Sequence, residues 1–142
     1  MKKLLLSILA LSVLAGCSSG VDEDNLKSVE RALNIRHLCI KASTRSAPDN
    51  FVEALKTSLA NKRISSEAMK NDGKDCEYIL IANAKGNRQL IARAKFSVIN
   101  AKTKSEVGVV GYKRRGDEKE RAKQTGLQGQ TDLMVNQLFK NY

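Results

Sequence analysis

The chain has 142 residues, a length typical of one domain. With 42% hydrophobic and 28% charged residues, the composition is that of a globular protein and excludes a disordered chain or a channel with several membrane spans. Lysine and arginine number 25 against 15 acids, and this formal net charge of +10 favours an anionic partner without identifying one.

The N-terminus has the pattern of an export signal. The basic start Met1-Lys2-Lys3 precedes an apolar run at 4–13, which is too short to cross a bilayer because a spanning helix needs roughly 20 apolar residues. Leu14-Ala15-Gly16-Cys17 then resembles the lipobox of bacterial lipoproteins. The resemblance implies removal of residues 1–16, diacylglycerol on the sulfur of Cys17 and an acyl chain on its new amino group. An ordinary signal peptide with an incidental cysteine is the alternative.

Ser18 bears on the destination of such a lipoprotein. The signal that retains lipoproteins in the inner membrane of enteric bacteria is Asp at this position, so the resemblance implies anchoring at the periplasmic face of the outer membrane rather than at the inner membrane. Removal of 1–16 takes away two lysines and no acid, which leaves a net charge of +8.

Residues 17–34 are expected to link this anchor to the domain. The polar stretch 18–25 predicts a flexible tether, and the spacing of Leu26, Val29 and Leu33 predicts a short helix. One α+β domain is then expected over 35–142.

The domain is expected to hold a mixed sheet of four to five strands with two main helices packed on it, in the order β-α-β-β-β-β-α. Alternation and β-branched runs predict strands at 35–42, 64–69, 76–84, 90–99 and 107–112.

Capping signals predict where the two helices begin. Ser46–Asp49 has the S-x-x-D form of a capping box, and the helix after it is expected to bury Phe51, Val52, Leu55 and Leu59. Thr131 is expected to cap the final helix, which packs Met134, Val135 and Leu138 on the sheet.

The later strands carry further signals. Tyr78–Ile81 is apolar on both faces, which predicts a central strand covered on two sides, whereas 90–99 alternates as a half-exposed antiparallel strand with Arg93, Lys95 and Ser97 toward water. Gly108 and Gly111 indicate a bulge or a close backbone approach. The charged stretch 113–123 is expected to be a solvated loop or hairpin extension.

Three short segments carry another pattern, namely Leu38-Cys39-Ile40, Glu53-Ala54-Leu55 and Asp75-Cys76-Glu77-Tyr78. Together they resemble a family of short, uncharacterised proteobacterial lipoproteins, over about residues 35–112, in which two cysteines occupy these places. The stretch 113–123 departs from that pattern. More loosely, the strand order is similar to envelope accessory lipoproteins: transporter auxiliary lipoproteins, the curli secretion lipoprotein and activators of peptidoglycan synthases.

Cys39 and Cys76 are expected to form a disulfide. Lipid uses Cys17, which leaves an even pair of cysteines in an oxidising compartment. Two separate buried thiols are one alternative. A metal site that combines them with His37 and Asp75 is another, but the spacing is not that of a metal motif.

The sequence contains few features that indicate an enzyme. The single histidine, His37, has no nucleophile motif such as GxSxG, and no phosphate-binding glycine motif occurs. We therefore expect no catalytic residue, metal or cofactor, and no nucleic-acid partner.

Lys113, Arg114 and Arg115 are the candidate binding residues, for an envelope protein or an anionic envelope polymer. The expected function is that of a non-enzymatic adaptor or accessory component of an envelope machine. The alternative is a small-ligand or lipid-binding periplasmic module, which would need an apolar cavity between helices and sheet.

Overall fold

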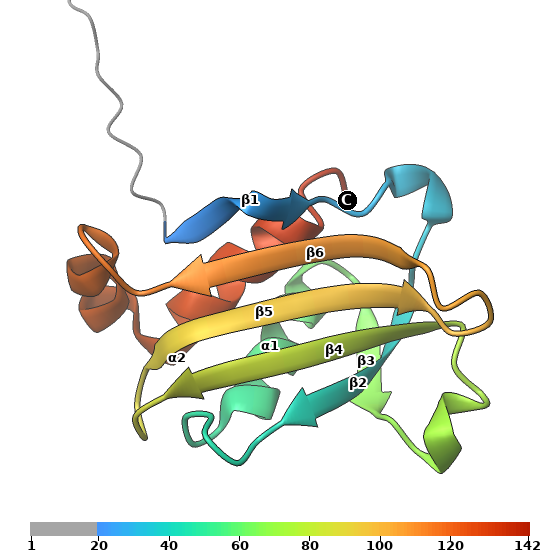
Figure 1. The fold of residues 1–142 in the computed structure, drawn as a ribbon, viewed down its shortest axis with the longest axis horizontal. Helices are drawn as coiled ribbons and strands as arrows, with labels where there is room; N and C mark the ends of the chain where they lie inside the picture. The colour runs from blue at the N-terminus through green and yellow to red at the C-terminus, as the bar shows by residue number, and fades with distance from the viewer. Residues whose placement is uncertain (1–19) are drawn as a thin grey trace, which may run out of the picture.

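The computed structural model describes residues 20–142, which form an α+β fold with one mixed six-stranded sheet and two α-helices (Figure 1). The elements in chain order are β1 (Val21–Lys27), β2 (His37–Ser43), α1 (Phe51–Asn61), β3 (Ser65–Ala68), β4 (Tyr78–Gly86), β5 (Ile91–Asn100), β6 (Glu106–Lys113) and α2 (Glu118–Leu138). Short 3-10 turns lie at Arg31–Leu33 and Asn71–Gly73. The expected signal sequence, Cys17 and Ser18 lie outside the described residues.

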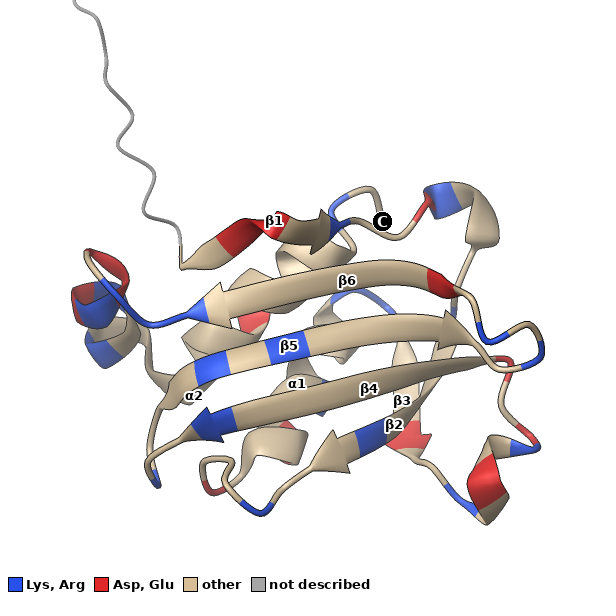
Figure 2. Cartoon of the chain, viewed as in Figure 1, with Lys and Arg blue, Asp and Glu red and all other residues tan. Residues whose placement is uncertain are grey.

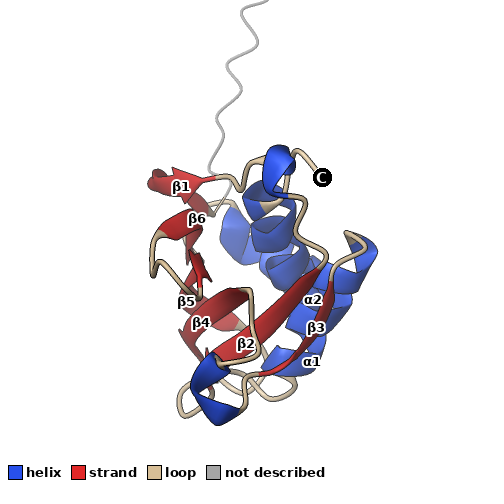
Figure 3. Cartoon of the chain, turned by 90° about the vertical axis from the view of Figure 1, so that its right-hand side faces the viewer, coloured by secondary structure: helices blue, strands red, loops and turns tan. Residues whose placement is uncertain are grey.

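The strands are ordered β1-β6-β5-β4-β2-β3 across the sheet. Pairing is antiparallel from β1 through β6 and β5 to β4, and parallel from β4 through β2 to β3. Both α-helices lie on one face of this sheet, and we call the opposite side the open face (Figure 3). The α+β class and the mixed sheet with two helices are confirmed. In the part of the chain from Gly20 onward, no helix has the length and apolar character needed to cross a membrane.

The core lies between the helices and the sheet. Phe51 of α1 contacts Phe96 of β5 with ring centroids 5.9 Å apart. Leu55 and Leu59 of α1 are fully buried, which confirms the predicted helix face except at Val52, which is half-buried. The predicted inner face of the last helix is also buried, at Met134, Val135 and Leu138.

β4 is central, as predicted, but the helices cover it on one side only. Leu80 and Ala82 are fully buried under them, whereas Ile81 on the open face is half-buried and Lys85 is exposed. The predicted cover on two sides therefore holds only in part: on the open face Ile79 is 5% exposed, with the loop at Gly73 against it, whereas Ile81 two residues later is half-buried. The reason lies in the topology, which places both helices on the same side.

From Val21 onward, the expected tether is instead a strand. β1 pairs with β6 through Val21↔Tyr112 and Asp22↔Gly111, so the sheet has six strands rather than four to five. Its residues have no alternating apolar pattern, but the edge of β6 offers unpaired backbone groups that any sequence can satisfy. The short helix predicted from Leu26, Val29 and Leu33 is only the turn Arg31–Leu33.

The charged stretch 113–123 is a loop only at 114–117. Lys113 completes β6, and α2 begins at Glu118, whose side chain is only 1% exposed. Burial of an acid paired with Arg121 lets this stretch fold without an apolar pattern.

Both capping predictions are wrong. Thr131 is fully buried and lies in the interior of α2, not at its start. The helix begins 13 residues earlier, at Glu118, and continues past a kink at Gly126, whereas the sequence predicted one short helix that begins after Thr131. The N-cap of α1 is Asn50, not a residue of the box at Ser46–Asp49, and it makes no side-chain capping bond.

Gly108 marks a bulge, as predicted. The register between β5 and β6 shifts beside it, and a Cβ on Gly108 would lie 2.4 Å from Val29 Cγ2 and 3.0 Å from Leu138 Cδ1. The glycine therefore lets β6 pass close to Val29, in the segment after β1, and to α2.

Candidate functional site: a cationic hollow on the open face

The open face is hollowed across five strands. The hollow has a volume of about 530 Å³, and residues from β1, β2, β4, β5 and β6 line it, among them Asp22, Ser43, Asn83, Lys95 and Gly111. Gly111 contributes no side chain at this place. A Cβ there would lie 3.1 Å from the Cβ of Asn25, so the glycine also permits the close approach of β1.

Three cations stand side by side at one end of the hollow. The register places Lys85 of β4 opposite Arg93 of β5, and Arg93 opposite Lys113 of β6. We call these three residues the cationic row; the blue bands on the ends of these strands show it in Figure 2. Neighbouring strands lie about 4.7–4.9 Å apart, and like charges placed directly opposite destabilise a sheet by roughly 0.2–1 kcal/mol per pair.

Acids do little to neutralise this end. Among residues 20–142, no ion pair within 4.0 Å joins the cationic row or Lys95 to a carboxylate. The pKa of Asp22 lies below its usual value because Asn25 donates a hydrogen bond to its carboxylate, aided by the Asp24 backbone N–H and by the charges of Lys113 and Arg115. The hollow therefore carries a net positive potential suited to an anionic group.

The structure separates the three predicted binding residues. Lys113 ends β6 in the cationic row, and Arg115 is exposed two residues later. Arg114 is half-buried, and its Nε donates a hydrogen bond of 3.0 Å to the carbonyl of Ile91. Lys113 and Arg115 are available to a partner, whereas Arg114 holds the end of β6 against β5.

Sequence reasoning did not assign Lys85, Arg93 and Lys95 to this site. The alternation of β5 placed Arg93 and Lys95 on the exposed face, and both are exposed. Their alignment with Lys85 and Lys113 depends on strand register, which the alternation within one strand does not carry.

The centre of the open face is apolar. Ile81, Ile99 and Val109 come from three neighbouring strands and are half-buried, with no helix over them in the described chain. This apolar centre lies beside Lys95 and the hollow. Together they form a surface with an apolar middle and a charged rim.

The predicted disulfide is confirmed. Cys39 of β2 bonds to Cys76 just before β4, with Cα atoms 6.1 Å apart and a sequence separation of 37. The bond ties the parallel pair β2–β4 to the loop that precedes β4. Both cysteines therefore belong to the scaffold.

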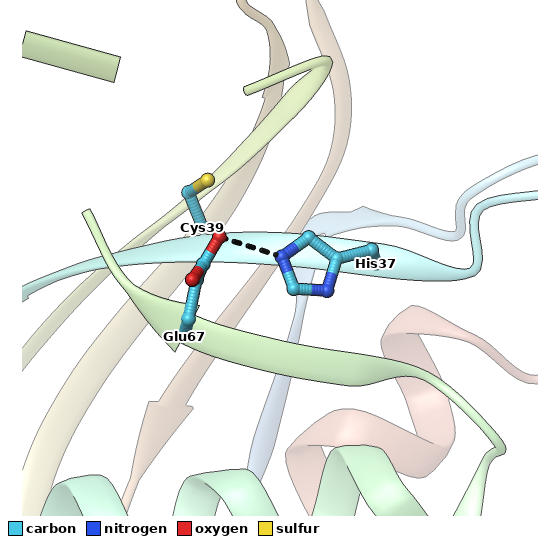
Figure 4. A group of neighbouring side chains, drawn as sticks. All are labelled: His37, Cys39 and Glu67. Atoms are coloured by element: carbon cyan, nitrogen blue, oxygen red, sulfur yellow. Dashed lines mark hydrogen bonds and ion pairs between the residues drawn. The ribbon is translucent and has the colours of Figure 1, made fainter. Parts of the chain in front are cut away.

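His37, Cys39 and Glu67 bring three possible metal-ligand atoms within 4.8 Å of one another (Figure 4). The sulfur of Cys39 is bonded to Cys76, so it cannot act as the thiolate that a metal requires. Asp75, which the sequence suggested as a further ligand, does not belong to the group. A histidine and one exposed carboxylate remain, which is too few ligands for a stable site.

The same histidine takes part in a serine–histidine–acid contact. Ser65 Oγ lies 2.7 Å from His37 Nδ1, and Glu67 Oε1 lies 3.1 Å from His37 Nε2. The side chains of His37 and Glu67 are 46% and 59% exposed, so the trio lies on open surface. Acyl-transfer chemistry needs a site that excludes water and stabilises an oxyanion. These contacts link β2 to β3 instead.

A buried polar network holds α2 against the end of β6. The Tyr112 hydroxyl donates a 2.7 Å hydrogen bond to Glu118, and Arg121 donates two bonds of 2.6 and 2.7 Å to the same carboxylate. Gln130 Nε2 donates a bond of 2.7 Å to the Tyr112 hydroxyl. Burial, together with the hydrogen bond to Glu118, raises the pKa of Tyr112 above its usual value. The network positions Lys113, the next residue of β6.

Comparison with known proteins supports the fold alone. No protein-family model matches the chain, and no curated protein matches it. Among solved structures, the PelC dodecamer from Paraburkholderia phytofirmans is similar, with a TM-score of 0.50 at 11% identity over 83% of this chain and 92% of that one. A second crystal form, of a PelC point variant, gives the same score and identity with 94% of its chain covered.

Proposed function

We propose that this chain is a non-enzymatic lipoprotein of the bacterial envelope that holds a protein partner on the open face of its sheet. Lipid on Cys17 anchors it at the periplasmic face of the outer membrane. The observation that carries the proposal is the uncovered apolar centre, Ile81, Ile99 and Val109, beside cations that no ion pair joins to a carboxylate within residues 20–142. An apolar middle with a polar rim is the usual make-up of a protein interface.

A small-ligand module is the alternative function. The hollow of about 530 Å³ falls within the usual size of ligand pockets, roughly 300–1,000 Å³. It lies on the open face, however, and charged and polar groups line much of it, whereas the space between helices and sheet is filled by core side chains. This favours the adaptor over a module that encloses an apolar ligand.

The test is site-specific crosslinking in cells. A photo-crosslinking amino acid replaces Ser97, which lies between Ile81 and Val109 on the open face, and a control replaces the exposed Ala60 on α1. We expect one discrete adduct from position 97 and none from position 60. The Lys95→Glu variant should weaken that adduct at least several-fold, whereas Lys102→Glu in the far turn should not.

Two outcomes would contradict the proposal. Adducts to a polysaccharide alone would assign the face to an anionic polymer. Adducts between two copies of this chain would assign it to self-assembly, the state seen in the PelC dodecamer.

A further inference from the structure

The cationic row lies at the end of the sheet where the chain enters the domain. The backbone N–H of Lys113 donates a 2.9 Å hydrogen bond to the carbonyl of Gly20, and Val21 pairs with Tyr112. Arg93 and Lys85 follow on the two neighbouring strands. Figure 2 shows these blue strand ends on the same side as the start of β1. The first described residue and the row are thus direct neighbours.

Very little chain separates this point from the proposed anchor. Only Ser18 and Ser19 lie between Cys17 and Gly20. Three extended peptide steps span roughly 10 Å at most, at about 3.3–3.6 Å per residue. Because β1 takes up most of the stretch expected to be a tether, a lipid on Cys17 would hold Gly20 within about 10 Å of the membrane surface.

The charges differ between the two ends of the sheet. The anchor end carries the cationic row, the exposed Arg88 in the turn after β4, and Arg115. Of the nearby acids, Glu118 is paired with Arg121, Glu120 with Lys123, and Asp22 bonds Asn25. Exposed acids also lie at this end, at Glu23 and Asp24 of β1 and at Asp49, but the cations there outnumber them. The far end mixes both signs, with Lys102 and Lys104 close in sequence to Glu106, and with Asp72, Asp75 and Glu77 beside Lys70 and Lys74.

We propose that the anchor end, defined by Lys85, Arg88, Arg93, Lys113 and Arg115, binds the anionic phospholipid headgroups of the membrane that holds Cys17. This inference rests on the lipid anchor of the proposed function. Salt screens charges over about 8–10 Å, so cations held within roughly 10 Å of the surface interact with it strongly. Each basic residue near an anionic bilayer strengthens the attraction on the order of fivefold.

The available space favours headgroups over a folded partner at this end. An α-helix with its side chains is about 10–12 Å across, as wide as the whole gap that the linker allows. With its cationic end on the membrane, the domain would hold its strands pointing away from the bilayer. The Asn100–Lys104 turn would then lie roughly 30 Å farther out, since β5 spans ten residues at about 3.3 Å each. The open face would remain accessible to a partner.

Fluorescence of a single tryptophan tests this orientation, because the chain contains no tryptophan. Gln89→Trp places a reporter in the exposed turn at the anchor end, and Lys102→Trp places the matched reporter at the far end. The full chain is expressed with its signal, and mass spectrometry of the purified protein establishes the lipid on Cys17. The protein is then reconstituted in vesicles of phosphatidylcholine with a headgroup nitroxide, with or without about one-third phosphatidylglycerol.

We expect phosphatidylglycerol to increase the quenching at both positions, with an increase at position 89 at least twice that at position 102. Salt at 0.5 M should abolish this difference between the two positions. Arg93→Glu/Lys113→Glu should remove the effect at position 89, whereas Lys102→Glu/Lys104→Glu, with the same change in net charge, should preserve it. Arg93→Gln/Lys113→Gln should at least halve the effect of phosphatidylglycerol at position 89. This neutral double variant replaces the Arg93→Glu/Lys113→Glu variant if the latter does not fold.

The results separate this inference from the proposed function. One outcome would overturn the membrane contact alone: the protein carries lipid, but quenching at position 89 does not respond to phosphatidylglycerol or to substitution of the cationic row. An acidic protein or polymer would then be the partner of the cationic row. A mature protein without lipid on Cys17 would overturn the anchor and this inference together.

Discussion

Glu118 shows how one residue can join two elements that the sequence leaves unrelated. Its carboxylate is 1% exposed, yet it accepts bonds from Tyr112 of β6 and Arg121 of α2. Gly20 packs against the same carboxylate, since a Cβ at Gly20 would lie 2.6 Å from its Cγ. A buried charge is tolerated when several hydrogen bonds satisfy it. The chain entry, β6 and α2 therefore meet at one side chain.

Removal of the Tyr112 hydroxyl should destabilise the fold. In Tyr112→Phe, Glu118 and Gln130 each lose a buried partner, which costs about 1–3 kcal/mol of the free energy of unfolding. Urea unfolding followed by circular dichroism measures this. Tyr78→Phe is the control, because Tyr78 is also buried but its hydroxyl bonds no described residue, and it should change stability by less than about 0.5 kcal/mol. Equal losses in the two variants would refute a role for the network.

Alkaline pH should destabilise the protein through the same tyrosine. Burial and the hydrogen bond to Glu118 raise the pKa of Tyr112 above the usual tyrosine value of 10.0, so the unfolded chain releases this proton first. The contribution of Tyr112 is therefore fully present below about pH 10 and declines as the pH rises further. Unfolding titrations between pH 9 and 12 should show a steeper decline for the wild type than for Tyr112→Phe.

Loss of the disulfide should cost a large part of the stability. The bond between Cys39 and Cys76 closes a loop with a sequence separation of 37, for which the chain-entropy model gives about 3–4 kcal/mol. Cys39→Ala/Cys76→Ala should lower the urea midpoint accordingly. Reductant should destabilise the wild type and leave this variant unchanged, and alkylation of the unfolded wild type without reductant should label neither Cys39 nor Cys76.

At the scale of elements, α2 depends on one glycine. Gly126 has φ 69° and ψ −169°, a conformation almost confined to glycine, and it divides the helix into two segments. The first segment packs through Glu118 and Ala122, and the second through Met134 and Leu138. The break in the helix at Gly126 lies between these two buried sets, so it sets the direction in which each segment packs.

Gly126→Ala should therefore destabilise α2 by about 1–3 kcal/mol. A Cβ at this position meets no atom within 4 Å, so the cost arises from the backbone conformation and not from a clash. Thermal unfolding followed by circular dichroism measures the change. Gln124→Ala, an exposed site in the same helix, should stay within about 0.5 kcal/mol of the wild type. A neutral Gly126→Ala would contradict the assigned role of the kink.

At the scale of the whole molecule, attachment to the membrane should depend on Cys17. Cys17→Ala removes the proposed lipidation site, and no helix of the described chain is long and apolar enough to cross a membrane. We expect the wild type to stay in the membrane fraction after a high-salt wash and the variant to leave it, since charge alone is screened by salt. Retention of the variant would refute the lipobox. Wild-type protein at inner-membrane density would refute the inference drawn from Ser18.

The sequence by itself determined those features that depend on local period and chemistry. The alternation of 90–99 predicted the half-exposed strand β5, the spacing of Leu55 and Leu59 predicted the buried face of α1, and the cysteine count predicted the disulfide. Each of these signals is contained in a short window, because side chains repeat with periods of 2 or 3.6 along one element.

Only the tertiary structure decided features that depend on pairing between distant segments. β1 forms because β6 has a free edge, and its polar sequence carries no strand pattern of its own. α2 extends back to Glu118 because Tyr112 and Arg121 satisfy a buried acid. The cationic row exists because the register of β4, β5 and β6 aligns Lys85, Arg93 and Lys113. Register is a relation between strands, and a shift of one residue would turn each side chain to the opposite face.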